Sequence, residues 1–202
     1  RSNLDFTNDV LSMHDAGFDI LSLEPVVLKD SPYAITEDDL PRVYEEYDRL
    51  VDAYMKCHRE GNGFWFFHFN MDLSNGPCVA KRLSGCGAGH EYFAVAENGD
   101  LYPCHQFVGR EGYRLGSLTE GVTNTELPQY FRESHVLNKE KCRDCWARFF
   151  CSGGCHANAD LFHGDIRKPY EIGCAIQKKR LECAILVQSL LALEKNEKKQ
   201  EA

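Results

Sequence analysis

Residues 142–155 read Cys-Arg-Asp-Cys-Trp-Ala-Arg-Phe-Phe-Cys-Ser-Gly-Gly-Cys and hold four cysteines, separated by two, five and three residues. The loop of a C-x2-C pair is short enough to turn both thiolates toward one metal centre. Gly153 and Gly154 allow the backbone to approach that centre, so that free N–H groups can point at sulfur. The stretch therefore predicts a thiolate-ligated metal site, and its spacing suits zinc as well as an iron–sulfur cluster.

The chain has ten cysteines in 202 residues, at positions 57, 78, 86, 104, 142, 145, 151, 155, 174 and 183. Cys57 and Cys183 read as packing thiols on helices. The other eight are enough for two sites of four thiolates each. Such cysteines form disulfides in an oxidising compartment and bind metal in a reducing one. The C-x2-C pair and the lack of a signal-peptide pattern favour metal, and we expect a cytoplasmic protein.

Composition excludes some classes of protein. The chain is 43% hydrophobic and 11% aromatic, which is enough for a buried core. A net charge of −8 argues against a nucleic-acid surface, which needs clustered positive charge. The sequence shows no apolar run of membrane-spanning length, so we expect neither nucleic acid nor membrane as a partner. Arg1 is not a natural start, and we expect a piece of a longer protein.

The first third of the chain predicts strand–helix units. A helix after Thr7 would end at Gly17, and the apolar run 18–27 would follow as a strand. A long amphipathic helix is predicted over residues 36–60, and an aromatic strand over residues 63–70. Apolar strands that alternate with helices are typical of a parallel sheet covered on both faces.

Glu24 lies near the carboxyl end of the first predicted strand, which is where α/β barrels build their active sites. A solvated carboxylate with no function is the alternative interpretation. His68, within the aromatic segment, is more typical of a hydrogen-bonded core histidine than of a metal ligand.

A cysteine-rich part begins near residue 75. Residues 91–96 and 100–103 flank Asn98-Gly99 and predict a β-hairpin, which would bring Cys86 and Cys104 to one centre. Further along, we expect a strand, a short helix, a long final helix and a frayed charged tail, over residues 113–118, 124–138, 175–194 and 195–201. The predicted fold class is α+β, with three parts: residues 1–74, 75–185 and 186–202.

The order of seven cysteines and one glycine matches a known pattern: Cys86, Gly99, Cys104, Cys142, Cys145, Cys151, Cys155 and Cys174. With these spacings, residues 80–180 resemble the SPASM domain of radical S-adenosylmethionine (radical SAM) enzymes that modify peptides. Residues 1–75 resemble the last strand–helix units of the partial (β/α)6 TIM-like barrel of those enzymes.

A narrower resemblance rests on short segments, which are Asn3–Val10, Glu24–Val27, Gly76–Leu83, Gly85–Gly89, Tyr102–Gly109 and Cys145–Cys155. They are similar to segments of the maturases of SCIFF peptides. Those oxidoreductases join a cysteine sulfur to the α-carbon of another residue in a ribosomally made, cysteine-rich precursor peptide (a RiPP). The product is a thioether, or sactionine, crosslink.

The resemblance implies two auxiliary 4Fe–4S clusters in the SPASM domain. The first would be held by Cys86, Cys104 and Cys155, and the second by Cys142, Cys145, Cys151 and Cys174. The fourth position of the first cluster is either Cys78 or open to a substrate thiolate. The clusters would bind that thiolate and transfer electrons, with an electron-donor protein as a further partner.

One motif of the family does not occur in this sequence. No stretch has the C-x3-C-x2-C spacing that holds the cluster that cleaves S-adenosylmethionine. We therefore expect S-adenosylmethionine and a third 4Fe–4S cluster only in a full-length parent, and no activity from this chain alone. In that parent, Asn3 and Glu24 would lie near S-adenosylmethionine.

Two other functions fit the same sequence. The chain resembles SPASM enzymes that mature sulfatases or quinone cofactors in the same general way. A zinc-stabilised module that binds a protein partner would use the same thiolates without redox chemistry. Iron and sulfide, as opposed to zinc, would separate the enzyme from the binding module.

Overall fold

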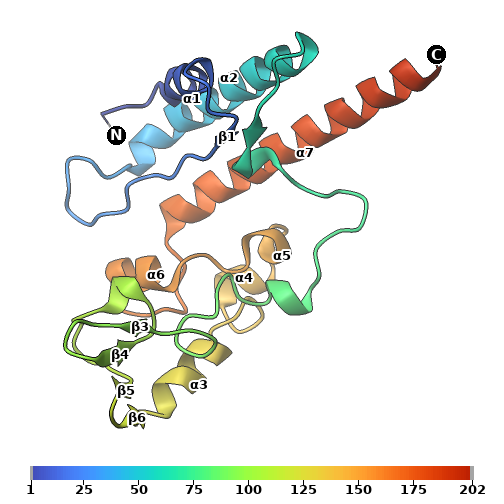
Figure 1. Cartoon of the computed structure of the whole chain (residues 1–202). Coiled ribbons are helices and arrows are strands. Elements are labelled where there is room, and N and C mark those ends of the chain that lie inside the picture. Colours follow the sequence, from blue (N-terminus) through green and yellow to red (C-terminus); the bar gives the residue numbers. More distant parts are fainter. Residues whose placement is uncertain (1, 201–202) are drawn as a thin grey trace. The chain divides into compact units, whose positions relative to one another are not determined.

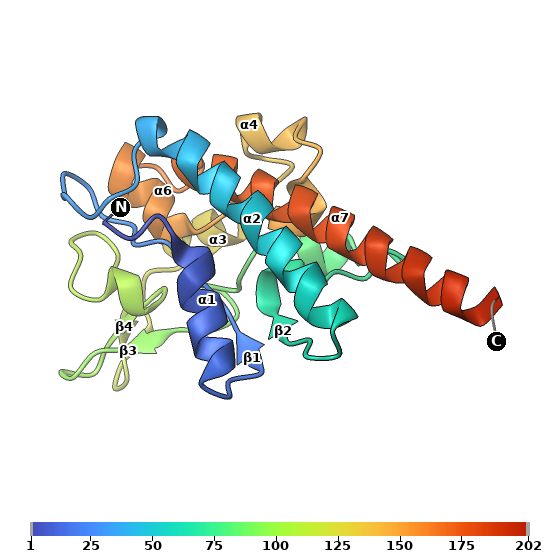
Figure 2. The same ribbon diagram turned by 90° about the horizontal axis from the view of Figure 1, so that it is seen from above.

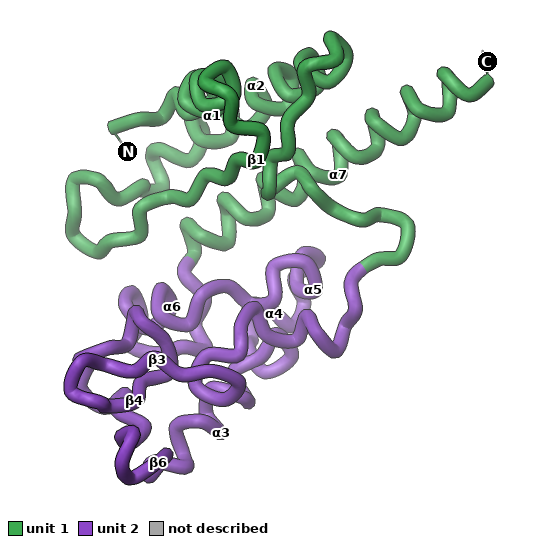
Figure 3. The backbone as a smooth tube through the Cα atoms, viewed as in Figure 1, with its two compact units in different colours: residues 1–76, 171–202 green, residues 77–170 purple. Residues whose placement is uncertain are grey.

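The computed structural model describes residues 2–200, which form two compact units (Figure 3). The first unit contains residues 2–76 and 171–200, and the second contains residues 77–170. The sequence had placed one boundary near residue 74 and had extended the cysteine-rich domain to residue 185. The second unit ends earlier, at residue 170, because residues 171–200 form one continuous helix that packs with the first unit.

The first unit is mainly helical (Figure 1). Its elements are α1 (Phe6–Asp15), β1 (Ile20–Leu21), the 3-10 helix η1 (Glu37–Asp39), α2 (Leu40–Arg59), β2 (Trp65–Phe66), the 3-10 helix η2 (Phe67–Phe69) and α7 (Glu171–Gln200). Figure 2 shows α2 between α1 and α7, and both neighbours pack against it.

Helix α2 confirms the predicted amphipathic helix over residues 36–60. The residues of its apolar face are all buried; they are Val43, Tyr47, Leu50, Val51, Tyr54 and Met55. They recur at three- and four-residue steps, so one stripe of the helix meets its neighbours. Pro41 lies in the first turn, where its missing N–H costs no hydrogen bond.

The predicted parallel pairing is confirmed, but the predicted strands are too long. β1 and β2 pair in parallel over two residues, with Ile20 opposite Trp65 and Leu21 opposite Phe66. Phe66 is 1% exposed, whereas Ile20 is 80% and Trp65 48% exposed, so only one face of the pair is covered. Among residues 2–200 this pair is the only parallel sheet, and the partial (β/α)6 barrel stays a prediction.

The second unit combines a small sheet with short helices. Its elements are η3 (Ala80–Arg82), β3 (Ala94–Val95), β4 (Asp100–Tyr102), η4 (His105–Phe107), β5 (Gly116–Ser117), β6 (Gly121–Val122), α3 (Glu126–Glu133), α4 (Glu140–Arg143), α5 (Arg148–Cys151) and α6 (His156–His163). The four strands are antiparallel and follow chain order. The predicted hairpin is confirmed as β3–β4, and Gly99 adopts the left-handed φ of +84° that its turn requires.

The core of the second unit surrounds one of the cysteines. Cys104 is buried together with Phe107, Phe131 and Ile166. The rings of Phe107 and Phe131 meet edge to face, with centroids 5.4 Å apart. The hydrophobic core therefore fixes the backbone at Cys104.

Helix α7 corrects the prediction of a frayed tail. The segment 195–200 continues the helix, because all its residues except Asn196 are lysine, glutamate or glutamine, which are good helix formers. Residue 201 lies outside the described residues. In residues 2–200, none of the helices combines the length and the apolar character that crossing a membrane requires.

Candidate metal centre

Three cysteines far apart in the chain converge in the second unit. Burial raises the pKa of the Cys104 thiol, and the sulfurs of Cys155 and Cys86 close to it raise that pKa further. Tyr92 faces the same group: its hydroxyl bonds Cys86, and burial together with the three sulfurs raises its pKa to about 12. The structure thus brings together the three residues predicted for the first cluster.

Backbone hydrogen bonds hold this first thiol group in place. The N–H of Gly89 donates to the carbonyls of Pro103 (3.0 Å) and Tyr92 (3.2 Å), which ties the loop after Cys86 to the end of β4. The N–H of Phe107 donates to the carbonyl of Cys104 at 3.0 Å, and the N–H groups of Gln106 and Phe107 partly offset the rise in the pKa of the Cys104 thiol. Hydrogen bonds of this kind favour the thiolate, which is the form that binds metal.

Cys155 completes the group from the N-terminus of α6. It occupies the N-cap position of this eight-residue helix, with φ of −78° and ψ of 126°. Cys86 and Cys155 are exposed, whereas Cys104 is buried, so the group opens to solvent on one side.

A second thiol group lies within residues 142–151. The N–H of Cys145 donates to the carbonyl of Cys142 at 3.0 Å, which closes the C-x2-C turn. Burial raises the pKa of the Cys151 thiol, and the sulfur of Cys145 nearby raises it further. The N–H groups of Gly153 and Gly154 point at the sulfur of Cys151, which confirms the predicted role of these glycines.

Two further ligands were predicted for these groups. Cys174 is in the first turn of α7, in the first unit, so its role as the fourth ligand of the second cluster stays a prediction. Cys78 is exposed and lies one residue after the start of the second unit. Its role as the fourth ligand of the first cluster also stays a prediction.

The donor chemistry of both groups fits iron–sulfur clusters. None of the ten cysteines, which all lie within the described residues, forms a disulfide, as metal binding requires and as the disulfide interpretation does not predict. Four buried polar side-chain atoms in residues 2–200 have no partner; those of Arg148 and Ser152 fall in the cysteine stretch, and that of His156 lies directly after it. A bound group with sulfur acceptors would satisfy the first two, which are donors.

The spacing of the donors bears on the kind of metal. Within residues 2–200, no three His, Cys, Asp or Glu side chains lie close enough together to hold a single metal ion. The case for an iron–sulfur group therefore rests on the facing thiols, on the N–H groups aimed at sulfur and on the orphaned donors.

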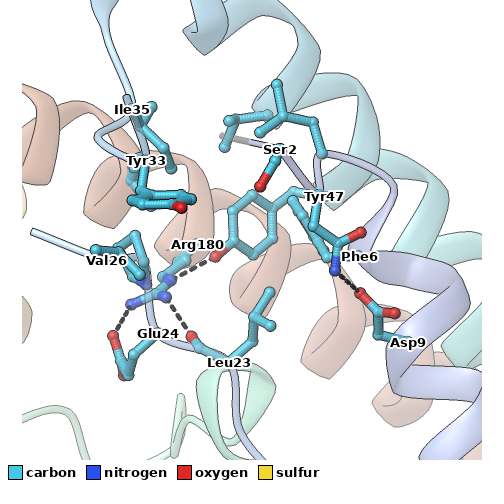
Figure 4. A pocket seen from close by; sticks show the side chains of 15 residues that line it. Ser2, Phe6, Asp9, Leu23, Glu24, Val26, Tyr33, Ile35, Tyr47 and Arg180 are labelled. Atoms are coloured by element: carbon cyan, nitrogen blue, oxygen red, sulfur yellow. Dashed lines mark hydrogen bonds and ion pairs between the residues drawn. The ribbon is translucent and has the colours of Figure 1, made fainter. Parts of the chain in front are cut away.

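A separate cavity in the first unit contains the two residues predicted near S-adenosylmethionine. Its volume is about 380 Å³, and both Asn3 and Glu24 line it (Figure 4). The amide of Asn3 donates to a carboxylate oxygen of Asp9 at 2.6 Å. The structure thus brings Asn3 and Glu24 to one cavity, although 21 positions separate them in the sequence.

An arginine that the sequence gave no reason to single out organises this cavity. Arg180, on α7, donates to Glu24 at 3.1 Å, to the hydroxyl of Tyr47 at 2.6 Å and to the carbonyl of Leu23 (Figure 4). A hydrogen bond with His68, whose Nε2 lies 3.2 Å from the carboxylate, and the charge of Arg180 lower the pKa of Glu24 to about 2. Glu24 and Arg180 are 156 positions apart, so no local pattern could have paired them.

Comparison with known proteins finds a similarity to an iron–sulfur domain. Residues 86–146 match the SPASM family, described as an iron–sulfur cluster-binding domain. An uncharacterized protein of Archaeoglobus fulgidus is 34% identical over 101 residues, which are 48% of this chain and 24% of that protein. A cysteine-type anaerobic sulfatase-maturating enzyme of Clostridium novyi is 26% identical over 140 residues, which are 64% of this chain and 35% of the enzyme.

Solved structures share the fold. Native anSMEcpe with bound AdoMet matches with a TM-score of 0.60 at 19% identity, over 94% of this chain and 54% of that chain. Native anSMEcpe with bound AdoMet and the Kp18Cys peptide also matches with a TM-score of 0.60 at 19% identity, over 96% and 55%. This chain thus spans about half of these structures and about a quarter to a third of the curated relatives. Together the comparisons show that part of this chain is similar to the SPASM family and to a sulfatase-maturating enzyme, and that its fold is similar to that of anSMEcpe.

Proposed function

We propose that this chain is the auxiliary-cluster portion of a radical SAM enzyme that modifies a peptide. The observation that supports it best is the convergence of Cys86, Cys104 and Cys155, whose sulfurs all face Tyr92. The SPASM match begins at the first of these cysteines. When bound, a 4Fe–4S cluster supplies an electron acceptor and iron sites for thiolates.

The side chains of the chain have distinct tasks in this proposal. Cys86, Cys104 and Cys155 would hold the first cluster, and Cys142, Cys145, Cys151 and Cys174 the second. The buried wall at Cys104 shields one side of the first group from water, whereas exposed Cys86 and Cys155 leave the other side open to a peptide. Either Cys78 or a thiolate of that peptide would take the remaining position.

We further propose a thioether crosslink as the product. Its formation would join a cysteine sulfur to an α-carbon with the loss of two hydrogens. One would leave the α-carbon as a hydrogen atom, taken by the radical made from S-adenosylmethionine, and the other would leave the thiol as a proton. Closure of the bond would then leave one electron, which a cluster held by these cysteines could accept. A cysteine-rich precursor peptide is therefore the proposed substrate. The bound Kp18Cys peptide in an anSMEcpe structure shows that a related fold can accept a peptide.

The test combines this chain with the segment that holds the C-x3-C-x2-C cluster, in one longer protein. That protein, with S-adenosylmethionine, an electron donor and a cysteine-rich peptide, should yield a product that lacks two hydrogens and keeps its sulfur. A matched protein in which Cys104 is replaced by Ala should bind less iron and form no product. A product that has lost sulfur would contradict the thioether.

A second candidate function has support from one relative. The Clostridium novyi match is a cysteine-type anaerobic sulfatase-maturating enzyme, so a cysteine of a sulfatase is the alternative substrate. Incubation of the same longer protein with a sulfatase peptide and with a cysteine-rich precursor peptide separates the two. Modification of the sulfatase peptide alone would favour this second function.

A further inference from the structure

One buried lysine touches the cysteine stretch at two places. Lys139 is 1% exposed and lies directly before α4. Its carbonyl accepts the N–H groups of Cys142 and Arg143, both at 3.0 Å. Its ammonium donates to the carbonyl of Gly153 at 2.9 Å. Lys139 thus contacts the backbone at the C-x2-C turn and again near Cys151.

The contact between the Lys139 ammonium and the Gly153 carbonyl leads through one peptide group to a sulfur atom. The carbonyl of Gly153 and the N–H of Gly154 belong to the same peptide group, and that N–H points at the sulfur of Cys151. Ser152, Gly153 and Gly154 have φ values of 59°, 87° and 71°, so the backbone curls and aims successive N–H groups at one atom. The result is a chain of hydrogen bonds from the ammonium, through a peptide, to the thiol.

A positive charge at one end of this chain of hydrogen bonds strengthens the hydrogen bond at its other end. The ammonium polarises the Gly153–Gly154 peptide and so strengthens the N–H bond to sulfur. A Cβ placed on Gly153 would lie 3.5 Å from the Lys139 nitrogen, so the ammonium packs directly against this backbone. The side chain is removed from solvent, and its field is screened less than that of a surface lysine.

We propose that Lys139 is a positioning residue that raises the reduction potential of the cluster held by Cys151, acting through the Gly153–Gly154 peptide. The inference rests on the proposed function, in which Cys151 is a cluster ligand. Reduction adds negative charge to the cluster and its thiolates. A buried cation and strengthened N–H bonds to sulfur stabilise that added charge.

The size of the effect follows from Coulomb's law. For a separation of roughly 10 Å and an effective dielectric constant of about 20, a unit charge changes a one-electron equilibrium by roughly tenfold. Tenfold is about 59 mV for a one-electron couple. Removal of the charge should therefore lower the potential of this cluster by about that amount and leave the other cluster almost unchanged.

The experiment uses the whole chain, reconstituted with iron and sulfide without oxygen. Lys139→Gln removes the charge and keeps a hydrogen-bond donor, whereas Lys139→Arg keeps both. Lys141→Gln is the matched control, because it removes an exposed lysine two positions along. Iron and sulfide content is measured first, and each cluster is then titrated against potential and followed by electron paramagnetic resonance.

We expect Lys139→Gln to lower one of the two potentials, Lys139→Arg to restore it, and Lys141→Gln to change neither. Loss of this cluster in Lys139→Gln but not in Lys139→Arg would support the same role for the charge. Unchanged potentials in a loaded Lys139→Gln chain would overturn the inference, as would cluster loss in both variants, which indicates packing alone. A wild-type chain that takes up no iron and sulfide would overturn the proposed function itself.

Discussion

Replacement of Arg180 by Met should destabilise the first unit by about 3 kcal/mol. Arg180 is 6% exposed, and its guanidinium donates to three groups: the Tyr47 hydroxyl, the Glu24 carboxylate and the Leu23 carbonyl. Methionine keeps most of the apolar stem and loses all three bonds. Tyr47 is 2% exposed, so its hydroxyl would remain buried without this donor.

The magnitude is a sum of three unequal parts. An unsatisfied buried hydroxyl costs about 1–3 kcal/mol, and a lost bond to a carbonyl costs about 1 kcal/mol. The carboxylate of Glu24 is 64% exposed and regains water, so its ion pair adds only about 0–1 kcal/mol. The total is about 3 kcal/mol, which is a large fraction of the stability of a small domain.

Tryptophan fluorescence during urea unfolding provides the assay. The chain has two tryptophans, Trp65 in the first unit and Trp146 in the second. A Trp146→Phe background therefore reports on the first unit alone. Lys179→Met is the matched control on the same helix, because its ion pair with Asp48, which is 60% exposed, should contribute less than about 1 kcal/mol.

A double substitution tests the cost of the unsatisfied Tyr47 hydroxyl separately. Tyr47→Phe together with Arg180→Met leaves no orphaned hydroxyl, so the pair should be more stable than Arg180→Met alone by about 1 kcal/mol. The reasoning would be refuted if Arg180→Met cost no more than Lys179→Met, or if the double variant were less stable than the single one.

Three further predictions concern charge, ligands and backbone. The folded-state pKa of Glu24, about 2, is below the usual 4.5, so its ionised form adds stability above pH 4.5 that is lost as pH falls toward 2. Glu24→Gln should remove this pH dependence, worth less than about 1 kcal/mol for so exposed a group, in urea titrations on either side of that window. Cys104→Ala should lower bound iron by about half, whereas Cys78→Ala should retain most of it because three thiolates remain, as iron assays would show. Gly116→Ala should lower the free energy of unfolding by about 2–3 kcal/mol, because the added Cβ would lie 2.0 Å from the carbonyl oxygen of Gly121 and residue 116 has a φ of +152°. Urea unfolding followed by Trp146 fluorescence would measure this loss.

Each of these three predictions has an outcome that would contradict it. An unchanged pH profile in Glu24→Gln would mean that the carboxylate does not titrate as described. Equal iron loss in Cys78→Ala and Cys104→Ala would make Cys78 an essential ligand. Gly109→Ala is the control for Gly116→Ala, since its φ is +75° but no atom lies within 4 Å of the added Cβ, and equal costs would contradict the steric argument.

Local patterns were sufficient for much of the secondary structure. Apolar residues at three- and four-residue steps predicted α2, and Asn98-Gly99 predicted the β3–β4 hairpin, because both signals act within a few residues. The lengths of β1 and β2 were wrong, since an apolar run does not show where its partner strand stops.

The sequence predicted the local contacts of the candidate site but not its long-range ones. The contacts of Gly153 and Gly154 with Cys151 could be predicted, because short spacing and glycine's freedom determine them. The grouping of Cys155 with Cys86 and Cys104 came only from a family resemblance, because Cys104 and Cys155 are 51 positions apart in the sequence. Arg180 was missed, since it reaches Glu24 through packing between α2 and α7.

Iron, zinc and acid-labile sulfide, measured on the chain purified without oxygen, test the central claim most directly. Two 4Fe–4S clusters predict about eight iron atoms and eight sulfides per chain, a brown colour and no stoichiometric zinc. A colourless protein with about two zinc ions per chain and no sulfide would contradict the claim.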